Sequence, residues 1–105
     1  MIVRLTATHG RDETITIEIA PGKCVSFGRT QGDWIFDNDE CMSRLHFEIE
    51  NFGDRAVVRD RQSCSGTRLN GPHVGEKDLQ IGDRIEAGHT FFTVDFLPIF
   101  SPDDN

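Results

Sequence analysis

The chain has 105 residues, of which 36% are hydrophobic and 28% charged, and this composition is typical of one small globular domain rather than of a disordered chain. Its formal net charge of −7 argues against nucleic acid and against anionic membranes as partners, because both require a basic surface. No run of apolar residues approaches the length needed to cross a membrane.

Short runs of apolar residues, several in strict alternation with polar ones, follow one another along the chain and predict β-strands. The predicted strands are 2–8, 14–19, 24–27, 34–36, 45–50, 55–60, 67–69, 84–86 and 91–96. Turn residues separate them, and the strongest hairpin signal is Asn70-Gly71. Because no window shows helical periodicity and strands recur every ~8–12 residues, we expect an all-β fold, an antiparallel sandwich or barrel. The domain is predicted to span 1–97, followed by a flexible tail or the start of a linker at 98–105.

The cysteines, serines and histidines show no pattern of a catalytic or metal site. Cys24, Cys41 and Cys64 are odd in number and widely spaced, so we expect no disulfide framework, no zinc site and a reducing, cytoplasmic setting. Ser43 and His46 lie where a strand is predicted to begin, and a period of two would turn their side chains to opposite faces unless a bend intervenes. The sequence contains no nucleophile elbow, zinc-protease motif or phosphate-binding P-loop. We therefore predict that the protein is not an enzyme and needs no cofactor.

Arginines in the predicted loops indicate recognition of an anion instead. Arg supplies nine of the eleven basic residues, and its planar guanidinium suits the forked recognition of phosphate. Gly28-Arg29 ends one predicted strand and Ser43 precedes another, so two loops at one end of a sandwich would bring a guanidinium and a hydroxyl together. A third loop, 62–71, is rich in glycine and small polar residues and suits contact with a peptide backbone. The alternative is that each loop only makes its turn, since such residues are common in all β-proteins.

Four segments, in this order and spacing, resemble the forkhead-associated (FHA) domain, a family of phosphothreonine-peptide binding modules. They are Gly28-Arg29, Ser43-Arg44-Leu45-His46, Ser63-Cys64-Ser65-Gly66-Thr67 and Asn70-Gly71. The similarity covers residues 2–96, nearly the whole chain. Any one of these segments alone carries little information, whereas all four together form a specific signal.

The resemblance implies an antiparallel β-sandwich of about eleven short strands, with the ligand lying across loops at one end. It assigns phosphate binding to Arg29 and Ser43. It assigns binding of the peptide to Arg44, Cys64, Ser65 and Asn70. It assigns structural support of the site to Gly28, His46, Gly66 and Thr67. The implied partners are a phosphothreonine-containing protein or peptide and a Ser/Thr kinase or its substrate, which would make the domain a signalling or regulatory adaptor.

The third segment departs from the family pattern at two positions. The family usually has Asn before Gly-Thr, where this chain has Ser65, and a hydroxyl-bearing residue before that, where this chain has Cys64. A serine offers one donor where an amide offers two, and a thiol is a weak donor. These changes favour a second hypothesis, in which a structural or assembly domain keeps the FHA fold but binds its partners without phosphate.

Overall fold

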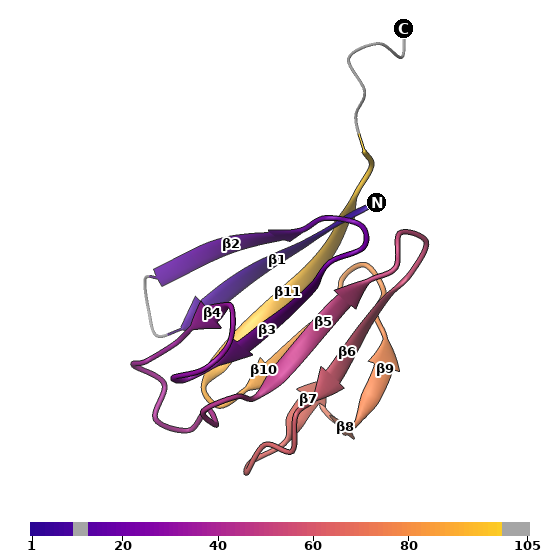
Figure 1. The fold of residues 1–105 in the computed structure, drawn as a ribbon. Helices are drawn as coiled ribbons and strands as arrows, with labels where there is room; N and C mark the ends of the chain where they lie inside the picture. The colour runs from indigo at the N-terminus through magenta and orange to yellow at the C-terminus, as the bar shows by residue number, and fades with distance from the viewer. Residues whose placement is uncertain (10–12, 100–105) are drawn as a thin grey trace, which may run out of the picture.

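The computed structural model describes residues 1–9 and 13–99, and the regular structure in these residues is β-strand throughout (Figure 1). The strands are β1 (Ile2–His9), β2 (Glu13–Ile19), β3 (Cys24–Gly28), β4 (Trp34–Ile35), β5 (Phe47–Asn51), β6 (Ala56–Asp60), β7 (Thr67–Leu69), β8 (His73–Val74), β9 (Glu76–Asp78), β10 (Arg84–Ala87) and β11 (Thr90–Leu97). The predicted all-β sandwich of eleven short strands is confirmed. Within the described residues there is no helix that could cross a membrane.

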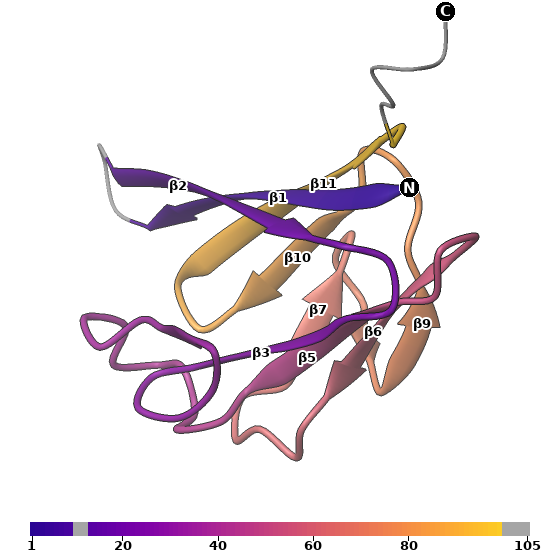
Figure 2. The ribbon, with the colours of Figure 1, turned by 45° about the horizontal axis from the view of Figure 1, so that its top comes forward.

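The strands form two sheets that pack face to face. One sheet has the order β2-β1-β11-β10-β7-β8 and the other the order β4-β3-β5-β6-β9. Figure 2 shows β1, β2 and β11 in one layer and β3, β5 and β6 in the other. Neighbouring strands are antiparallel except β3 and β4, which run parallel with Phe27 opposite Trp34. Strand β1 pairs with β2 on one side and with β11 on the other, so both ends of the domain meet in the middle of one sheet.

The core between the sheets is built around four phenylalanines. Phe27 of β3 stacks on Phe47 of β5, with ring centroids 4.5 Å apart. Phe92 of β11, from the opposite sheet, meets these two rings edge-on at 5.5 and 5.1 Å, and Phe36 meets Phe92 in the same way. Aromatic pairs contribute about 0.5–1.5 kcal/mol each beyond the area that they bury. Because Phe27 and Phe47 lie at the ends of their strands, this cluster anchors the points where two loops leave the sheet.

The sequence pattern does not predict β8 and β9. Strand β9 has the sequence Glu-Lys-Asp, all three residues are exposed, and none of them favours a strand. It forms because the edge of β6 holds it in register, with Val58 opposite Lys77. The predicted strand 45–50 begins at Phe47 instead, and the residues before it bend. A bend therefore intervenes between Ser43 and His46, and it brings the His46 ring to the backbone N–H of Ser43.

Three loops meet at the end of the sandwich that lies away from the N-terminus (Figure 1). They are the β3–β4 loop (29–33), the β4–β5 loop (36–46) and the β6–β7 loop (61–66). The short β10–β11 turn (88–89) lies at the same end. These four segments therefore hold the residues that a ligand at this end would meet. Of the predicted tail at 98–105, residues 100–105 lie outside the described residues.

Candidate functional site

The β3–β4 and β4–β5 loops are bonded to each other through their backbones. The N–H of Arg29 donates to the Ser43 carbonyl at 2.9 Å, and the N–H groups of Thr30 and Gln31 donate to the Arg44 carbonyl at 3.2 and 2.9 Å. Each loop thus satisfies polar backbone groups of the other, which leaves neither loop free to move alone. As a result, the chain at Arg29 runs directly beside the chain at Ser43.

Gly28 makes this close approach possible. A Cβ on Gly28 would lie 2.0 Å from the Arg44 carbonyl oxygen and 2.4 Å from that of Gln31. Both obstacles are backbone atoms, which cannot turn aside as a flexible side chain can. Gly28 is not among the glycines with positive φ. Glycine is therefore required here for space, and not for a left-handed backbone conformation.

The guanidinium of Arg29 is braced against the β4–β5 loop. Its Nε donates to the Met42 carbonyl at 3.1 Å. Within the described residues, its two terminal nitrogens have no hydrogen-bond or ion-pair partner. The bond at Nε fixes the plane of the guanidinium and leaves four N–H groups available to a ligand.

Ser43 is held by bonds to its backbone and to its hydroxyl. Its N–H donates to Nδ1 of His46 at 3.0 Å, and its Oγ accepts the N–H of Cys64 at 2.8 Å. Because Oγ acts as the acceptor toward Cys64, the hydrogen of the hydroxyl remains for another acceptor. Ser43 can therefore donate to a ligand that also meets Arg29.

His46 is fully buried and joins two loops from beneath. Its Nδ1 accepts from Ser43, and its Nε2 lies 2.9 Å from the Gly66 carbonyl oxygen. A ring nitrogen that faces an N–H must accept and one that faces a carbonyl must donate, so the ring is the neutral tautomer with its proton on Nε2. The ring also meets Phe47 edge-on, at 6.3 Å between centroids. One imidazole thus links the β4–β5 loop, the β6–β7 loop and the core.

Asp60, the last residue of β6, organises the β6–β7 loop. Its carboxylate accepts from both the N–H and the hydroxyl of Ser63 and, at 2.8 Å, from the hydroxyl of Thr67. Burial opposes the charged form, but the hydrogen bonds outweigh it and lower the pKa of Asp60 below its ordinary value. Asp60 therefore closes the loop by bonding Ser63 within it and Thr67 at the start of β7. The only sequence signal for this role is an Asp placed just before a loop, which favours local turns.

Four of the predicted site residues line one groove with a volume of about 410 Å³. They are Arg29, Ser43, Arg44 and Cys64. The rest of the wall consists of Glu40, Cys41, Met42, Leu45 and Gln62. Two guanidinium groups thus meet one carboxylate in the groove wall, which makes the groove more basic than the chain as a whole.

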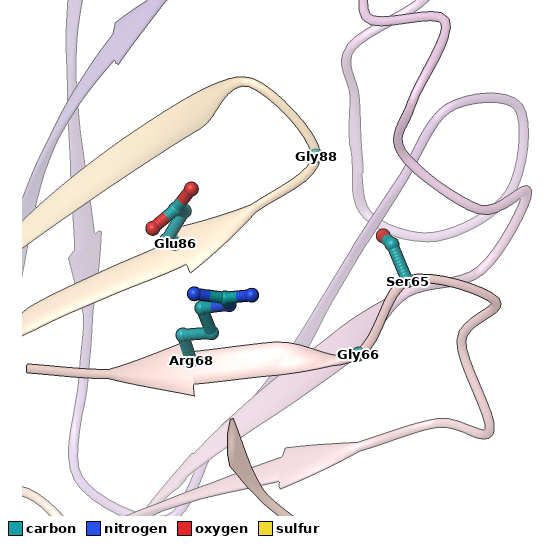
Figure 3. A pocket seen from close by; sticks show the side chains of 5 residues that line it. All are labelled: Ser65, Gly66, Arg68, Glu86 and Gly88. Atoms are coloured by element: carbon teal, nitrogen blue, oxygen red, sulfur yellow. The ribbon is translucent and has the colours of Figure 1, made fainter. Parts of the chain in front are cut away.

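Ser65 and Gly66 line a second cavity, of about 220 Å³, at the other side of the β6–β7 loop (Figure 3). In Figure 3, Arg68 of β7 and Glu86 of β10 project into this cavity from neighbouring strands, where they lie opposite each other in register. No ion pair joins them within the described residues. The cavity therefore presents a cation and an anion to whatever passes Ser65.

The hydroxyl of Ser65 already has a partner inside the domain. Its Oγ donates to the Cys41 carbonyl at 3.3 Å, and its own carbonyl lies 3.2 Å from Nε2 of His73. The neighbouring Gly66 has a φ of +83°, and a Cβ there would lie 2.6 Å from the His73 ring. The segment thus keeps its shape through contacts within the domain, and Ser65 offers less to a ligand than an amide would.

Asn70 lies at the far end of β7, apart from the other predicted site residues. Its Nδ2 donates to Asp83 at 2.9 Å and its Oδ1 accepts the N–H of Arg84 at 2.9 Å. With a φ of +55°, it forms the turn that the sequence predicts there. Both halves of the amide are occupied in joining this turn to the start of β10. The structure therefore does not bring Asn70 together with the groove.

Sequence reasoning does not single out Asp39, whose side chain is completely buried. Its carboxylate accepts the N–H groups of Cys41 and His89, at 3.1 and 2.9 Å, and the hydroxyl of Thr90 at 2.7 Å. A Cβ at Gly88 would lie 2.7 Å from the Asp39 Oδ1, so glycine makes room for the carboxylate. Asp39 therefore ties the β4–β5 loop to the β10–β11 turn. In the sequence it is one acid among several in a polar loop and reads as solvated.

No group of three or more His, Cys, Asp or Glu side chains in residues 1–9 and 13–99 is arranged to hold a metal ion. All three cysteines are free and exposed. Donors outnumber the one carboxylate in the groove, since two guanidinium groups and a hydroxyl with an unused hydrogen line it. Such a set suits an anion rather than a cation.

Residues 25–88, more than half of the chain, match the model of the family described as the FHA domain. A structure from a study of phosphothreonine-dependent FHA domain interactions is 30% identical, with a TM-score of 0.79 over 91% of this chain and 99% of that one. The FHA domain of FhaA, solved in complex with the intracellular domain of Rv3910, is 32% identical, with a TM-score of 0.79 over 89% and 99%. The FHA domain of a hypothetical protein of Arabidopsis thaliana is 26% identical, with a TM-score of 0.82 over 95% and 89%.

Among curated protein sequences, none matches the chain significantly. The family match nevertheless spans every segment of the groove, from β3 to the β10–β11 turn. The solved structures agree with it along nearly the full length of both chains. This chain therefore belongs to the FHA domain family.

Proposed function

We propose that this domain binds phosphothreonine-containing peptides or proteins, with Arg29 and Ser43 as its phosphate ligands. The observation that carries the proposal is the pairing of a braced guanidinium, whose terminal nitrogens lack partners within the described residues, with a hydroxyl whose hydrogen is unused. Phosphothreonine brings about −1.5 to −2 charge at pH 7 and three acceptor oxygens. A guanidinium can meet two of these with parallel bonds, and a hydroxyl can meet the third. A similar structure comes from work on phosphothreonine-dependent FHA interactions, which supports the same ligand here.

The other residues of the site then divide by position. Arg44 and Cys64 border the path of the peptide, because both line the groove. Ser65 contributes less, since its hydroxyl donates to a carbonyl of the domain, and Asn70 steadies a turn away from the ligand. Structural support comes from Gly28, His46, Gly66 and Thr67. The partner class is a phosphothreonine protein, such as a Ser/Thr kinase or its substrate.

The test is capture of a degenerate phosphothreonine peptide library by the domain, with the unphosphorylated library as reference. Hydrogen bonds to charged groups contribute about 1.5–3 kcal/mol, so Arg29→Ala should weaken capture by at least about tenfold. Arg55→Ala is the matched control, because it removes the same charge from an exposed ion pair with Asp78, outside the groove. Capture of phosphopeptides that is equal in Arg29→Ala and Arg55→Ala would overturn the proposal.

A second candidate function is phosphate-independent assembly on the same fold. The observation that favours it is the occupied hydroxyl of Ser65, which stands where the family usually has an amide for the peptide backbone. On this hypothesis, a partner captured by the domain stays bound after phosphatase treatment and is retained by Arg29→Ala. On the leading hypothesis, both treatments release it.

Binding without catalysis is part of the same proposal. Ser43 Oγ accepts a hydrogen bond from Cys64, and the imidazole nearest to it, His46, faces the Ser43 N–H with the nitrogen that could act as a base. Neither group is therefore placed for nucleophilic attack. We also propose that residues 1–97 form the binding unit and that it works in the cytoplasm, where thiols such as those of this chain remain reduced.

A further inference from the structure

A thiol and an imidazole face each other at the edge of the groove, and the proposed function uses neither. Sγ of Cys41 lies 2.9 Å from Nε2 of His89. Cys41 comes from the β4–β5 loop and also lines the groove that holds Arg29 and Ser43. His89 comes from the β10–β11 turn. Both residues are exposed, so reagents in solution can reach the pair.

The buried carboxylate of Asp39 holds the two partners in place. It accepts the N–H of Cys41 with one oxygen and the N–H of His89 with the other. Because these two bonds act on the backbones, they fix the positions of both α-carbons and leave the side chains free to react. The fold therefore keeps the two backbones close enough for the thiol and the imidazole to meet.

The other two cysteines lack this arrangement and serve as comparisons within the same molecule. Burial and the adjacent carboxylate of Glu48 raise the pKa of Cys24 to about 11, so its thiol stays protonated near neutral pH. Cys64 is exposed in the same groove as Cys41, but within the described residues its Sγ has no hydrogen-bond partner. Of the three thiols, Cys41 alone has an imidazole within hydrogen-bond distance among the described residues.

We propose that Cys41 and His89 form a reactive thiol site that hydroperoxides oxidise, and that an oxidised Cys41 and a bound phosphopeptide exclude each other. The exclusion rests on the proposed function, whereas the reactivity does not. In the reaction, Nε2 of His89 takes the thiol proton while Sγ attacks the terminal peroxide oxygen. The O–O bond breaks, an S–O bond forms, and the departing alkoxide or hydroxide takes the proton from His89. Sulfur is oxidised by two electrons to the sulfenic acid, and the peroxide is reduced to an alcohol or water.

The mutual exclusion of phosphopeptide and oxidised Cys41 follows from the position of Cys41 in the wall of the groove. It lies two residues before Ser43, and its carbonyl accepts the hydroxyl of Ser65 from the opposite loop. A peptide that runs from Arg29 toward the β6–β7 loop would cover its thiol. Conversely, an oxygen or an alkyl group added to Sγ takes up space in the groove that the peptide needs. A bound peptide should therefore slow modification of Cys41, and modification of Cys41 should weaken peptide binding.

The reactivity is tested by alkylation of the whole chain with iodoacetamide, with the extent at each cysteine read by peptide mapping. A positioned general base contributes about 10²–10⁴-fold, so Cys41 should react at least about tenfold faster than Cys64. His89→Asn should bring Cys41 down to the rate of Cys64. His73→Asn, which removes another exposed imidazole that contacts a carbonyl and no thiol, should leave the rate unchanged. Hydrogen peroxide followed by dimedone should label Cys41 first.

Equal rates at Cys41 and Cys64, or a fast Cys41 that is unaffected by His89→Asn, overturn the reactive site. Far-UV circular dichroism confirms that each variant is folded.

For the exclusion, a saturating phosphopeptide should slow alkylation of Cys41 at least about tenfold while Cys24 reacts as before. A phosphopeptide that binds without protecting Cys41 overturns the exclusion. If no phosphopeptide binds, the exclusion falls with the proposed function, and the reactive thiol is still decided by its own rates.

Discussion

Replacing His46 by leucine separates the hydrogen bonds of the buried ring from the space that it fills. The ring joins the Ser43 N–H to the Gly66 carbonyl beneath the groove. Leucine is similar in size and has no polar atom, so contact with Phe47 is largely kept. The change leaves the Ser43 N–H and the Gly66 carbonyl, both partly buried, without their partner.

Each buried polar group that loses its partner costs about 1–3 kcal/mol, so His46→Leu should lower the free energy of unfolding by about 2–6 kcal/mol. A domain of this size has about 5–15 kcal/mol in total, so the loss is a large share of the stability. Ile49→Val is the reference variant, since it removes one methylene from the core side of the neighbouring strand β5 and should cost about 0.5–1.5 kcal/mol.

Urea titration followed by far-UV circular dichroism measures both values, and an unchanged m-value shows that the unfolding transition is the same. Phosphopeptide affinity, measured at a temperature where both variants are folded, should fall for His46→Leu and stay constant for Ile49→Val. If His46→Leu lies within about 0.5 kcal/mol of the wild type, the range of an ordinary surface substitution, the loops do not depend on this imidazole and the reasoning is refuted.

Gly28→Ala places a methyl group against two backbone carbonyls and should lower the free energy of unfolding by at least about 1–3 kcal/mol. In the control Gly75→Ala the new methyl group meets nothing within 4 Å, so the melting temperature should be nearly unchanged. Equal effects of the two substitutions on the melting temperature would contradict the steric argument. Folding lowers the pKa of Asp60. The contribution of its carboxylate to the free energy of unfolding is therefore complete above its ordinary pKa of 3.8, and it is lost as the pH falls through the lower pKa of the folded state. Stability measured against pH should show a slope in that acid range that Asp60→Asn lacks. Asn70→Ala breaks two hydrogen bonds and should cost about 1–3 kcal/mol, while phosphopeptide affinity changes by less than about twofold; a tenfold loss of affinity would place Asn70 back at the ligand.

The parts of the fold that the sequence predicts are those with their own pattern. Ile17 and Ile19 alternate with polar residues and are buried, and Ile15 continues the pattern onto an edge where it is 39% exposed. Strand β9 has no such pattern, because its conformation is imposed by its neighbour β6. A strand of three charged residues could not be predicted without knowing what lies beside it.

The same distinction applies to the site. Motif spacing indicated Arg29 and Ser43, and the structure brings them to one groove. Motif spacing could not indicate Asp39, because its partners at the β10–β11 turn lie about fifty positions away in the chain. Asn70 belongs to the same set of motifs but lies apart from the groove and bonds a turn, since membership of a motif does not tell a ligand contact from a turn contact.

The backbone bonds between the β3–β4 and β4–β5 loops also bear on the kinetics of binding. Loops that are joined before the ligand arrives lose little conformational freedom when it binds, so association requires no slow rearrangement. Diffusional encounter then governs the on-rate, and the net charge of −7 repels an anionic ligand at long range. Moderate salt screens that repulsion more than it screens the contact at Arg29. Added salt should therefore accelerate association, the reverse of its usual effect on a basic phosphate-binding protein.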